Sequence, residues 1–239
     1  MELIIDEGNT RVKLAIFINN GINRVIETSD LTQDVLDQID ETPDRILYCS
    51  TRKTSAHTIQ MLQAKADVLV FDHHTPIPIH NDYRTPDTLG SDRIAAVIGA
   101  RFLQNDGPLL TIDAGTCITY DLLTADDRYV GGKISPGSAI RFKSLHDYTG
   151  NLPLVEQTEN WLSVGHDTIT SIQAGVLHGL CAEINQTITD YESQYQGLHV
   201  FLTGGEARYF VNHIKRKIFA NRNLVLLGLH KILKFNDKA

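Results

Sequence analysis

Apolar, β-branched residues recur in short runs near the start of the chain, and polar turn formers bound each run. Residues 2–6 and 12–18 are two such runs separated by a Gly-Asn-Thr turn, and residues 22–28 supply a third. Strands tolerate branched side chains well, whereas glycine and asparagine favour turns. The pattern therefore predicts an N-terminal meander of three strands.

Two more apolar runs follow, at residues 45–50 and 67–71, and residues 53–65 between them have helical character. An alternation of strand and helix is typical of parallel strands joined by helical crossovers. The first part of the chain is thus predicted to be a mixed sheet with flanking helices.

Residues 72–91 contain three prolines and keep no period, so they are predicted to form a long loop. Loops of this length inside compact domains are usually functional or disordered. Ser91 or Asp92 is predicted to cap a helix over residues 92–105, whose apolar side chains lie along one stripe.

The second half begins with residues 108–137, which are predicted to form three strands separated by turns. Residues 137–196 are expected to be helical, and the clearest helix starts at a cap at Asp167. A strand at 199–203, two glycines and a helix come next, and the apolar segment 223–235 closes the chain.

Composition excludes several classes of protein. The 239 residues suffice for one large domain or two small ones, and the three cysteines form no Cys-x-x-Cys pair, which favours a reducing, cytoplasmic setting. The net charge of −7 argues against a nucleic-acid partner, and the basic stretch 213–222 is interpreted as a solvated helix face. No signal-peptide pattern or membrane-length apolar run is present, so no membrane association is expected.

One motif occurs twice. IIDEGNTRVK near the N-terminus aligns with TIDAGTCITY, which matches Asp6 with Asp113 and Gly8 with Gly115 at an offset of 107 residues. Two ordinary hairpins would use the same residue types. A repeat at nearly half the chain length instead favours a pair of phosphate-binding turns on two related lobes.

The chemistry of the two turns suits a nucleoside triphosphate. Glycine keeps backbone N–H groups approachable, while Asn9, Thr10 and Thr116 offer side-chain donors. The two aspartates repel phosphate and are therefore expected to hold cations or water, and Lys13 can reach the terminal phosphates. Neither a P-loop nor a dinucleotide-binding glycine motif is present, and the histidines of the long loop lack helical ligand spacing.

Four segments together resemble type III pantothenate kinases, a family within the actin, sugar kinase and heat-shock chaperone superfamily. They are DEGNTRVK, LGSDR preceded by Tyr83, DAGTCIT and GGKISPG, and DTITSIQAGVLHG and FLTGGEA agree as well. The resemblance implies an α/β fold of two ribonuclease H-like lobes, each a mixed sheet with flanking helices, with an ATP cleft between them. Their expected extents are residues 1–106, with the acceptor loop, and 107–239.

The same resemblance assigns roles. ATP would bind with Mg²⁺, and a monovalent cation, K⁺ or NH₄⁺, would bind at Asp113, while Asp6 is a candidate Mg²⁺ ligand through water. Asp92 would be the general base, and the family forms homodimers with the acceptor pocket near the subunit interface. The ATP-binding set is Asp6, Glu7, Gly8, Asn9, Thr10, Arg11, Val12, Lys13 and Thr116, and the pantothenate-binding set is Tyr83, Gly90, Ser91, Asp92, Arg93 and Thr168.

Elementary chemistry is compatible with these roles. An aspartate at the positive end of a helix is favoured in its ionised form, and the neighbouring guanidinium of Arg93 can take a carboxylate of the acceptor. The pair could equally be a helix cap with a surface ion pair, Tyr83 could simply plug its loop, and Thr168 could merely begin a helix. Glu7 departs from the family by adding negative charge at a phosphate site, and Cys117 is expected to be a small buried hydrophobe rather than an exposed thiol.

Three functions remain open from the sequence. The first is an ATP-dependent kinase that converts pantothenate to 4'-phosphopantothenate at the start of coenzyme A synthesis. The second is a non-catalytic regulatory or accessory protein on the same scaffold, and the third is a kinase for another small hydroxy acid or sugar. Retention of Asp92 argues against the second, because a binding module has no use for a base there.

Overall fold

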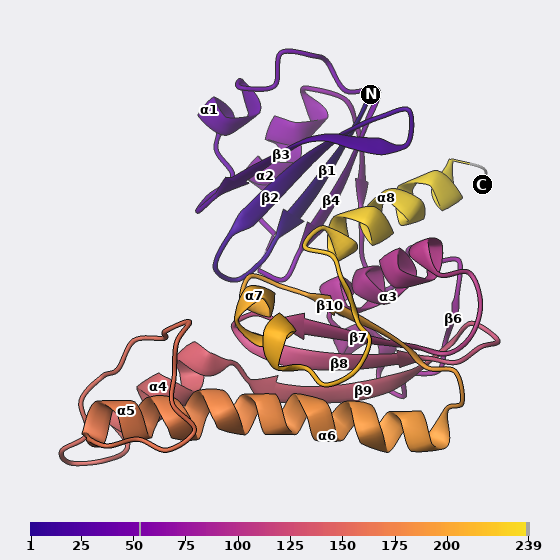
Figure 1. The fold of residues 1–239 in the computed structure, drawn as a ribbon. Coiled ribbons are helices and arrows are strands. Elements are labelled where there is room, and N and C mark those ends of the chain that lie inside the picture. Colours follow the sequence, from indigo (N-terminus) through magenta and orange to yellow (C-terminus); the bar gives the residue numbers. More distant parts are fainter. Residues whose placement is uncertain (53, 238–239) are drawn as a thin grey trace. The chain divides into compact units, whose positions relative to one another are not determined.

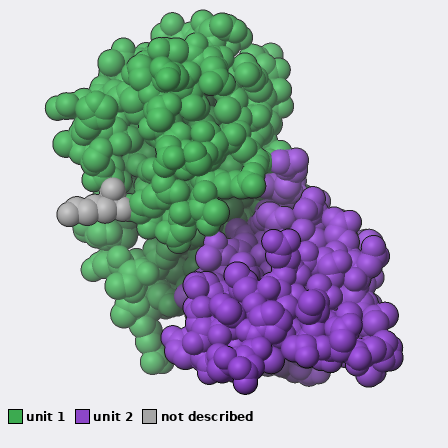
Figure 2. Space-filling model, turned by 90° about the vertical axis from the view of Figure 1, so that its left-hand side faces the viewer, with its two compact units in different colours: residues 1–105, 127–129, 223–239 green, residues 106–126, 130–222 purple. Residues whose placement is uncertain are grey.

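The computed structural model describes residues 1–52 and 54–237. Its chain forms two compact units (Figure 2), one of residues 1–105, 127–129 and 223–239 and the other of residues 106–126 and 130–222. The predicted lobes, 1–106 and 107–239, differ from these units chiefly in the C-terminal segment. That segment forms an apolar helix whose packing partners belong to the first unit.

The first unit is built on a five-stranded sheet with the strand order β3-β2-β1-β4-β5. β1, β2 and β3 form the predicted antiparallel meander, whereas β4 and β5 run parallel to β1. The β2–β3 turn contains Asn19 and Asn20, both with positive φ (52° and 65°), as tight hairpins require. The strands are β1 (Glu2–Glu7), β2 (Val12–Ile18), β3 (Gly21–Thr28), β4 (Arg45–Ser50) and β5 (Asp67–Val70).

Helices cover this sheet. α2 confirms the helical stretch predicted for 53–65, of which residue 53 lies outside the described residues, while α1 was too short for its pattern to be noticed. The loop predicted at 72–91 is irregular apart from two short elements, β6 (His80–Asn81) and η1 (Pro86–Thr88). The helices are α1 (Gln33–Leu36), α2 (Ala56–Gln63), α3 (Ser91–Leu103) and α8 (Leu224–Asn236).

The start of α3 differs from the prediction. Its N-cap is Gly90, so neither Ser91 nor Asp92 is the capping residue, and both lie in the first turn. The carboxylate of Asp92 instead accepts a hydrogen bond from the backbone N–H of Arg93 at 2.9 Å. α3 is buried continuously from Arg93 to Ala100, and α8 lies alongside it (Figure 1). Packing therefore fixes the helix that carries the predicted base.

The second unit repeats the topology of the first. Its strands follow the order β11-β10-β7-β8-β9, with β7 and β8 antiparallel and β10 and β11 parallel to β7. At the start of β9, Arg128 and Tyr129 pair with β6. The predicted internal repeat is thus confirmed at the level of fold, although β11, with two residues, was missed. The strands are β7 (Leu109–Ala114), β8 (Cys117–Leu123), β9 (Arg128–Pro136), β10 (His199–Thr203) and β11 (Phe219–Ala220).

The prediction that residues 137–196 are helical was wrong for residues 148–167, which are irregular. This stretch contains Pro153, two glycines and two asparagines, which favour turns. It separates α4 from a long helix that begins with a capping box at Asp167, as predicted. The long helix is continuous through a π-helical turn. The helices are α4 (Ser138–Asp147), α5 (Thr168–Gln173), η2 (Ala174–His178), α6 (Gly179–Gln194), α7 (Ala207–Phe210) and η3 (Val211–His213).

Each unit has its own apolar core. In the first, side chains of β1, β2 and β4 pack with Leu36 and Leu62 from the helices. In the second, β7, β8 and β10 pack against α6 and Phe210. No helix among residues 1–52 and 54–237 is both long enough and apolar enough to cross a membrane.

Candidate active site

The first predicted phosphate-binding turn connects β1 to β2. Asp6 lies opposite Lys13 in the strand register, and residues 8–11 form the connection. The backbone N–H of Gly8 donates to the carbonyl of Arg11 at 2.9 Å, which closes the turn. The asparagine and threonine that follow Gly8 are exposed. Cross-strand partners project from the same face of a sheet, so an ammonium accompanies the carboxylate at the base of this turn.

The structure brings three predicted site residues together around a buried cysteine. Cys49 on β4 is the parallel-strand partner of Asp6 and is 0% exposed. Burial raises the pKa of its thiol far above the ordinary value, and the charges of Asp6 and Asp92 raise it further, whereas a hydrogen bond from Ser91 lowers it. Asp6, Ser91 and Asp92 are therefore neighbours of one side chain, although Cys49 itself was not identified from the sequence.

The predicted general base has a perturbed environment. Burial raises the pKa of Asp92, and the backbone N–H and the charge of Arg93 only partly offset that effect. The guanidinium of Arg93, a residue that is 6% exposed, lies 5.6 Å from the centre of the Tyr83 ring. The Tyr83 ring is in turn 6.1 Å from that of Tyr129. The alternative of a surface ion pair does not fit, because both members of the pair are mostly buried.

The second predicted turn connects β7 to β8 and is built like the first. Ala114 pairs with Ile118, and the N–H of Gly115 donates to the carbonyl of Cys117 at 3.0 Å. The carbonyl of Thr116, the predicted phosphate-binding residue, accepts a hydrogen bond from the N–H of Gly137 at 3.0 Å. The GGKISPG segment of the sequence therefore ends directly against this turn.

At two positions next to this turn, another backbone segment comes so close that there is no room for a side chain. A Cβ on Gly137 would lie 2.2 Å from the Gly115 carbonyl oxygen. Gly204 has φ +95°, and its Cβ would lie 2.3 Å from the Ala114 carbonyl oxygen and 2.4 Å from Oδ1 of Asp113. Only glycine fits either position. Segments that are far apart in the sequence thus meet at one turn.

Glu206 and Ser138, which the sequence did not single out, hold these segments in place. The Ser138 hydroxyl donates to Glu206 at 2.8 Å, and its backbone N–H donates to the same carboxylate at 3.4 Å. Burial raises the pKa of Glu206, and these hydrogen bonds oppose the shift. The N–H of Glu206 also donates to the Ala114 carbonyl at 2.8 Å. The sequence signal that could have identified them is their position, since Ser138 directly follows GGKISPG and Glu206 lies within FLTGGEA.

Asp113, the predicted ligand of a monovalent cation, is the penultimate residue of β7 and lies opposite Thr203. Its carboxylate and the Ala114 carbonyl converge on the bare backbone of Gly204, and oxygen donors of this kind suit K⁺ or a similar hard cation. In the part of the chain that the structure describes, no group of three or more His, Cys, Asp or Glu side chains could hold a metal ion.

Two remaining predictions have different outcomes. Thr168 is the first residue of α5 and is exposed, and its role in substrate binding stays a prediction. Cys117 is exposed at the second turn, so its prediction as a buried hydrophobe was wrong. Cys117 is the first residue of β8, directly after the turn, and its side chain is exposed to solvent.

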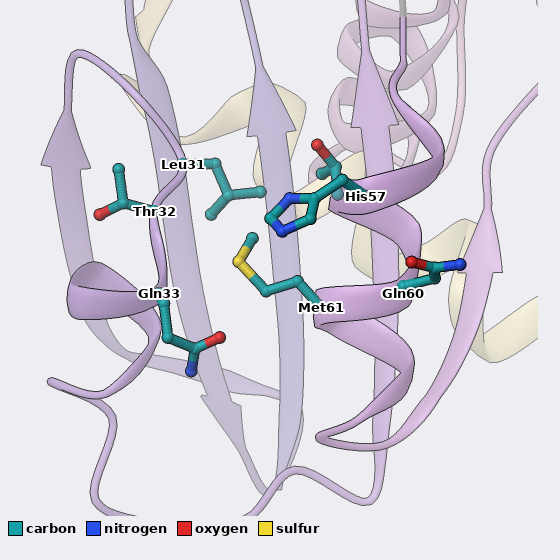
Figure 3. Close-up of a pocket in the computed structure, with 7 residues that line it drawn as sticks. Leu31, Thr32, Gln33, His57, Gln60 and Met61 are labelled. Carbon is teal, nitrogen blue, oxygen red and sulfur yellow. The ribbon is translucent and has the colours of Figure 1, made fainter.

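A surface hollow of the first unit does not coincide with these residues. It has a volume of about 630 Å³ and lies between α2 and the start of α1 (Figure 3). Its lining has no charged group suited to phosphate, and none of the predicted site residues contributes to it. The lining residues are Leu31, Thr32, Gln33, His57, Thr58, Gln60 and Met61.

Solved structures with the same fold include several phosphotransferases. A Campylobacter jejuni protein assigned to the Baf family of transcriptional activators matches with a TM-score of 0.64 and 20% identity, over 99% of this chain and 100% of that one. The inorganic polyphosphate/ATP-glucomannokinase of Arthrobacter sp. strain KM matches with a TM-score of 0.50 and 13% identity, over 100% of both chains. The fold is therefore the two-lobed α/β fold of actin-like sugar kinases, as predicted.

The sequence matches are much closer. The type III pantothenate kinase family model covers residues 2–190. A type III pantothenate kinase from Phocaeicola vulgatus is 42% identical over 100% of both chains, and one from Christiangramia forsetii is 39% identical over 99% of both. With the family model matching most of its length, the chain belongs to the type III pantothenate kinase family.

Proposed function

We propose that this protein transfers the γ-phosphoryl group of ATP to the primary hydroxyl of pantothenate, forming 4'-phosphopantothenate at the start of coenzyme A synthesis. The observation that carries the proposal is the buried Asp92–Arg93 pair at the start of α3, next to Asp6 at the first phosphate-binding turn. A base and an anchor for a carboxylate are the two groups that a hydroxy-acid acceptor needs.

Each proposed residue has a definite task. Asp92 accepts the proton of the attacking hydroxyl, and Arg93, supported by Tyr83, binds the carboxylate of pantothenate. Residues 6–13 and Thr116 bind the phosphates of ATP through backbone N–H groups, hydroxyls and Lys13. Mg²⁺ bound with ATP would neutralise charge on the phosphates, and we assign Asp6 to it through water.

The finer features of the proposal are a monovalent cation at Asp113, a homodimer and a cytoplasmic location. Self-association is supported by apolar side chains that the second unit leaves exposed close together in sequence, namely Tyr148 (88% exposed), Leu154 (60%) and Val164 (68%). Three free cysteines fit a reducing compartment. Sedimentation of the purified protein tests the dimer.

The activity is tested by incubating the purified protein with ATP, Mg²⁺ and pantothenate, and detecting 4'-phosphopantothenate by mass spectrometry. The reaction contains K⁺ or NH₄⁺, and a parallel reaction contains Na⁺ instead. If a monovalent cation binds at Asp113 as proposed, turnover should fall in the Na⁺ reaction. A panel of hydroxy acids and sugars tests the alternative acceptor. Product from another acceptor but not from pantothenate would overturn the proposal.

Substituting Arg93 with lysine is expected to raise KM for pantothenate by about tenfold while KM for ATP stays near that of the wild type. A lysine keeps the charge but loses the planar, bidentate geometry and the stacking on Tyr83. Steady-state kinetics with each substrate varied in turn measure the split. Equal changes in both KM values would contradict a role specific to the acceptor.

The pH dependence of kcat/KM should have an acid limb above pH 3.8, the ordinary pKa of an aspartate. Burial raises the pKa of Asp92, so the ionised base that accepts the proton is lost at a higher pH than for an exposed carboxyl. Circular dichroism at each pH distinguishes loss of the base from acid unfolding. A profile that stays flat down to the ordinary aspartate pKa would contradict this assignment.

A further inference from the structure

Glu7 places a carboxylate at the base of the first phosphate-binding turn, but the structure turns it toward β4. Its side chain is 15% exposed, and it accepts hydrogen bonds from the hydroxyls of Tyr48 and, at 3.1 Å, Ser50. Burial and the neighbouring Glu7 raise the pKa of Tyr48, so that hydroxyl remains a donor. The negative charge is thus held by the sheet rather than presented at the tip of the turn.

Arg52, just after β4, links Glu7 to that tip. Its Nη1 lies 3.7 Å from the carboxylate of Glu7 and 3.7 Å from that of Asp30, while its Nη2 donates to the backbone carbonyl of Asn9 at 2.8 Å. A single guanidinium therefore contacts both the base of the turn and its tip. The fork of five donors makes arginine suited to such bridging.

The backbone before Arg52 is also fastened to β1. The N–H of Thr51 donates to the Glu7 carbonyl at 3.0 Å, and the Ser50 hydroxyl accepts from the N–H of Arg52 at 3.0 Å. These hydrogen bonds fix the backbone position of Arg52. The position from which its side chain reaches Asn9 is therefore also fixed.

We infer that Arg52 and Glu7 are positioning residues that hold the first turn in the conformation that binds phosphate. A peptide group is planar, with its C=O and N–H pointing in opposite directions. Holding the Asn9 carbonyl toward Arg52 therefore directs the N–H of Thr10 to the opposite side of the turn, where a phosphate can accept it. The inference rests on the proposed function for the identity of the nucleotide, but not for the conformation of the turn.

The first test replaces Arg52 with methionine, and with lysine as the conservative variant. The methionine variant is expected to raise Kd for ADP and KM for ATP about tenfold, with KM for pantothenate unchanged, because it loses a charge-assisted hydrogen bond. Lysine should restore part of the affinity. Arg24→Met is the matched control, since Arg24 lies on β3 and its guanidinium donates to the Gln38 carbonyl at 3.3 Å.

Hydrogen exchange of peptides that cover residues 8–11 separates positioning from direct contact with phosphate. The inference expects faster exchange there in the nucleotide-free Arg52→Met protein than in the wild type and the Arg24→Met control. Weaker ADP binding with unchanged exchange would mean that Arg52 touches phosphate itself, which would overturn the positioning role. This readout needs neither ATP turnover nor pantothenate, so failure of the proposed function would not be mistaken for failure of this inference.

Glu7→Gln distinguishes the inference from a simple charge effect, because the two predict opposite changes in Kd for ADP. Removal of a negative charge next to a polyphosphate should tighten ADP binding if only charge mattered. The inference expects the opposite, a Kd for ADP raised about threefold, because Arg52 loses its ionic partner and releases the turn. In the Glu7→Gln, Arg52→Met double variant the two effects should not add. Tighter binding by Glu7→Gln, or fully additive effects, would overturn the inference.

Discussion

Asp92→Asn is expected to lower kcat for pantothenate phosphorylation by about 10²–10⁴-fold while leaving Kd for ADP close to that of the wild type. Asparagine keeps the size of the side chain and can still accept the hydrogen bond from the N–H of Arg93, but it cannot take a proton from the attacking hydroxyl. Steady-state kinetics and a nucleotide titration measure the two quantities separately. General-base loss should therefore affect turnover and not nucleotide binding.

The matched control is Asp87→Asn, the same change in the loop that precedes α3. Asp87 is exposed and contacts His73 at 3.8 Å, so its loss should change kcat by less than about twofold. A turnover of Asp92→Asn within a few-fold of the wild type would refute the base assignment. In cells, the regulatory alternative predicts that Asp92→Asn remains active, whereas the kinase proposal predicts failure to support coenzyme A synthesis.

Local patterns predicted the strands and the repeated turns because their determinants are close in sequence. Asp6 and Gly8 sit within one hairpin, and their copies Asp113 and Gly115 sit within another, so alternation and turn residues sufficed. The start of α3 was placed one residue too far along because Gly90, which has no side chain to accept a hydrogen bond, is its N-cap. Sequence rules for N-caps rank serine and aspartate above glycine, so Ser91 and Asp92 were preferred to Gly90.

Other features depend on register between distant strands and could not be read from periodicity. Cys49 meets Asp6 only because β4 pairs with β1 in parallel, and Arg52 reaches Asn9 for the same reason. Neither residue belongs to a motif of its own. Such neighbours become visible only when the partner of each strand is known.

Gly228→Ala is expected to destabilise the first unit by about 3 kcal/mol or more. The added Cβ would lie 1.7 Å from the carbonyl oxygen of Ala95 on α3, and in the other direction a Cβ on Gly99 would lie 2.1 Å from the carbonyl oxygen of Leu224. The backbones of α3 and α8 are thus in contact, and a methyl group between them must push the helices apart. Urea unfolding followed by circular dichroism measures the loss.

Gly179→Ala is the matched control, because it makes the same change in a helix where nothing lies within 4 Å of the new Cβ. There alanine should stabilise by up to about 1 kcal/mol through its higher helix propensity. Displacement of α3 by Gly228→Ala would also move Asp92 and Arg93 at its start, so kcat should fall even in the fraction that remains folded. Equal unfolding midpoints for Gly228→Ala and Gly179→Ala would show that α8 can shift without cost, contrary to the close packing of the two helices.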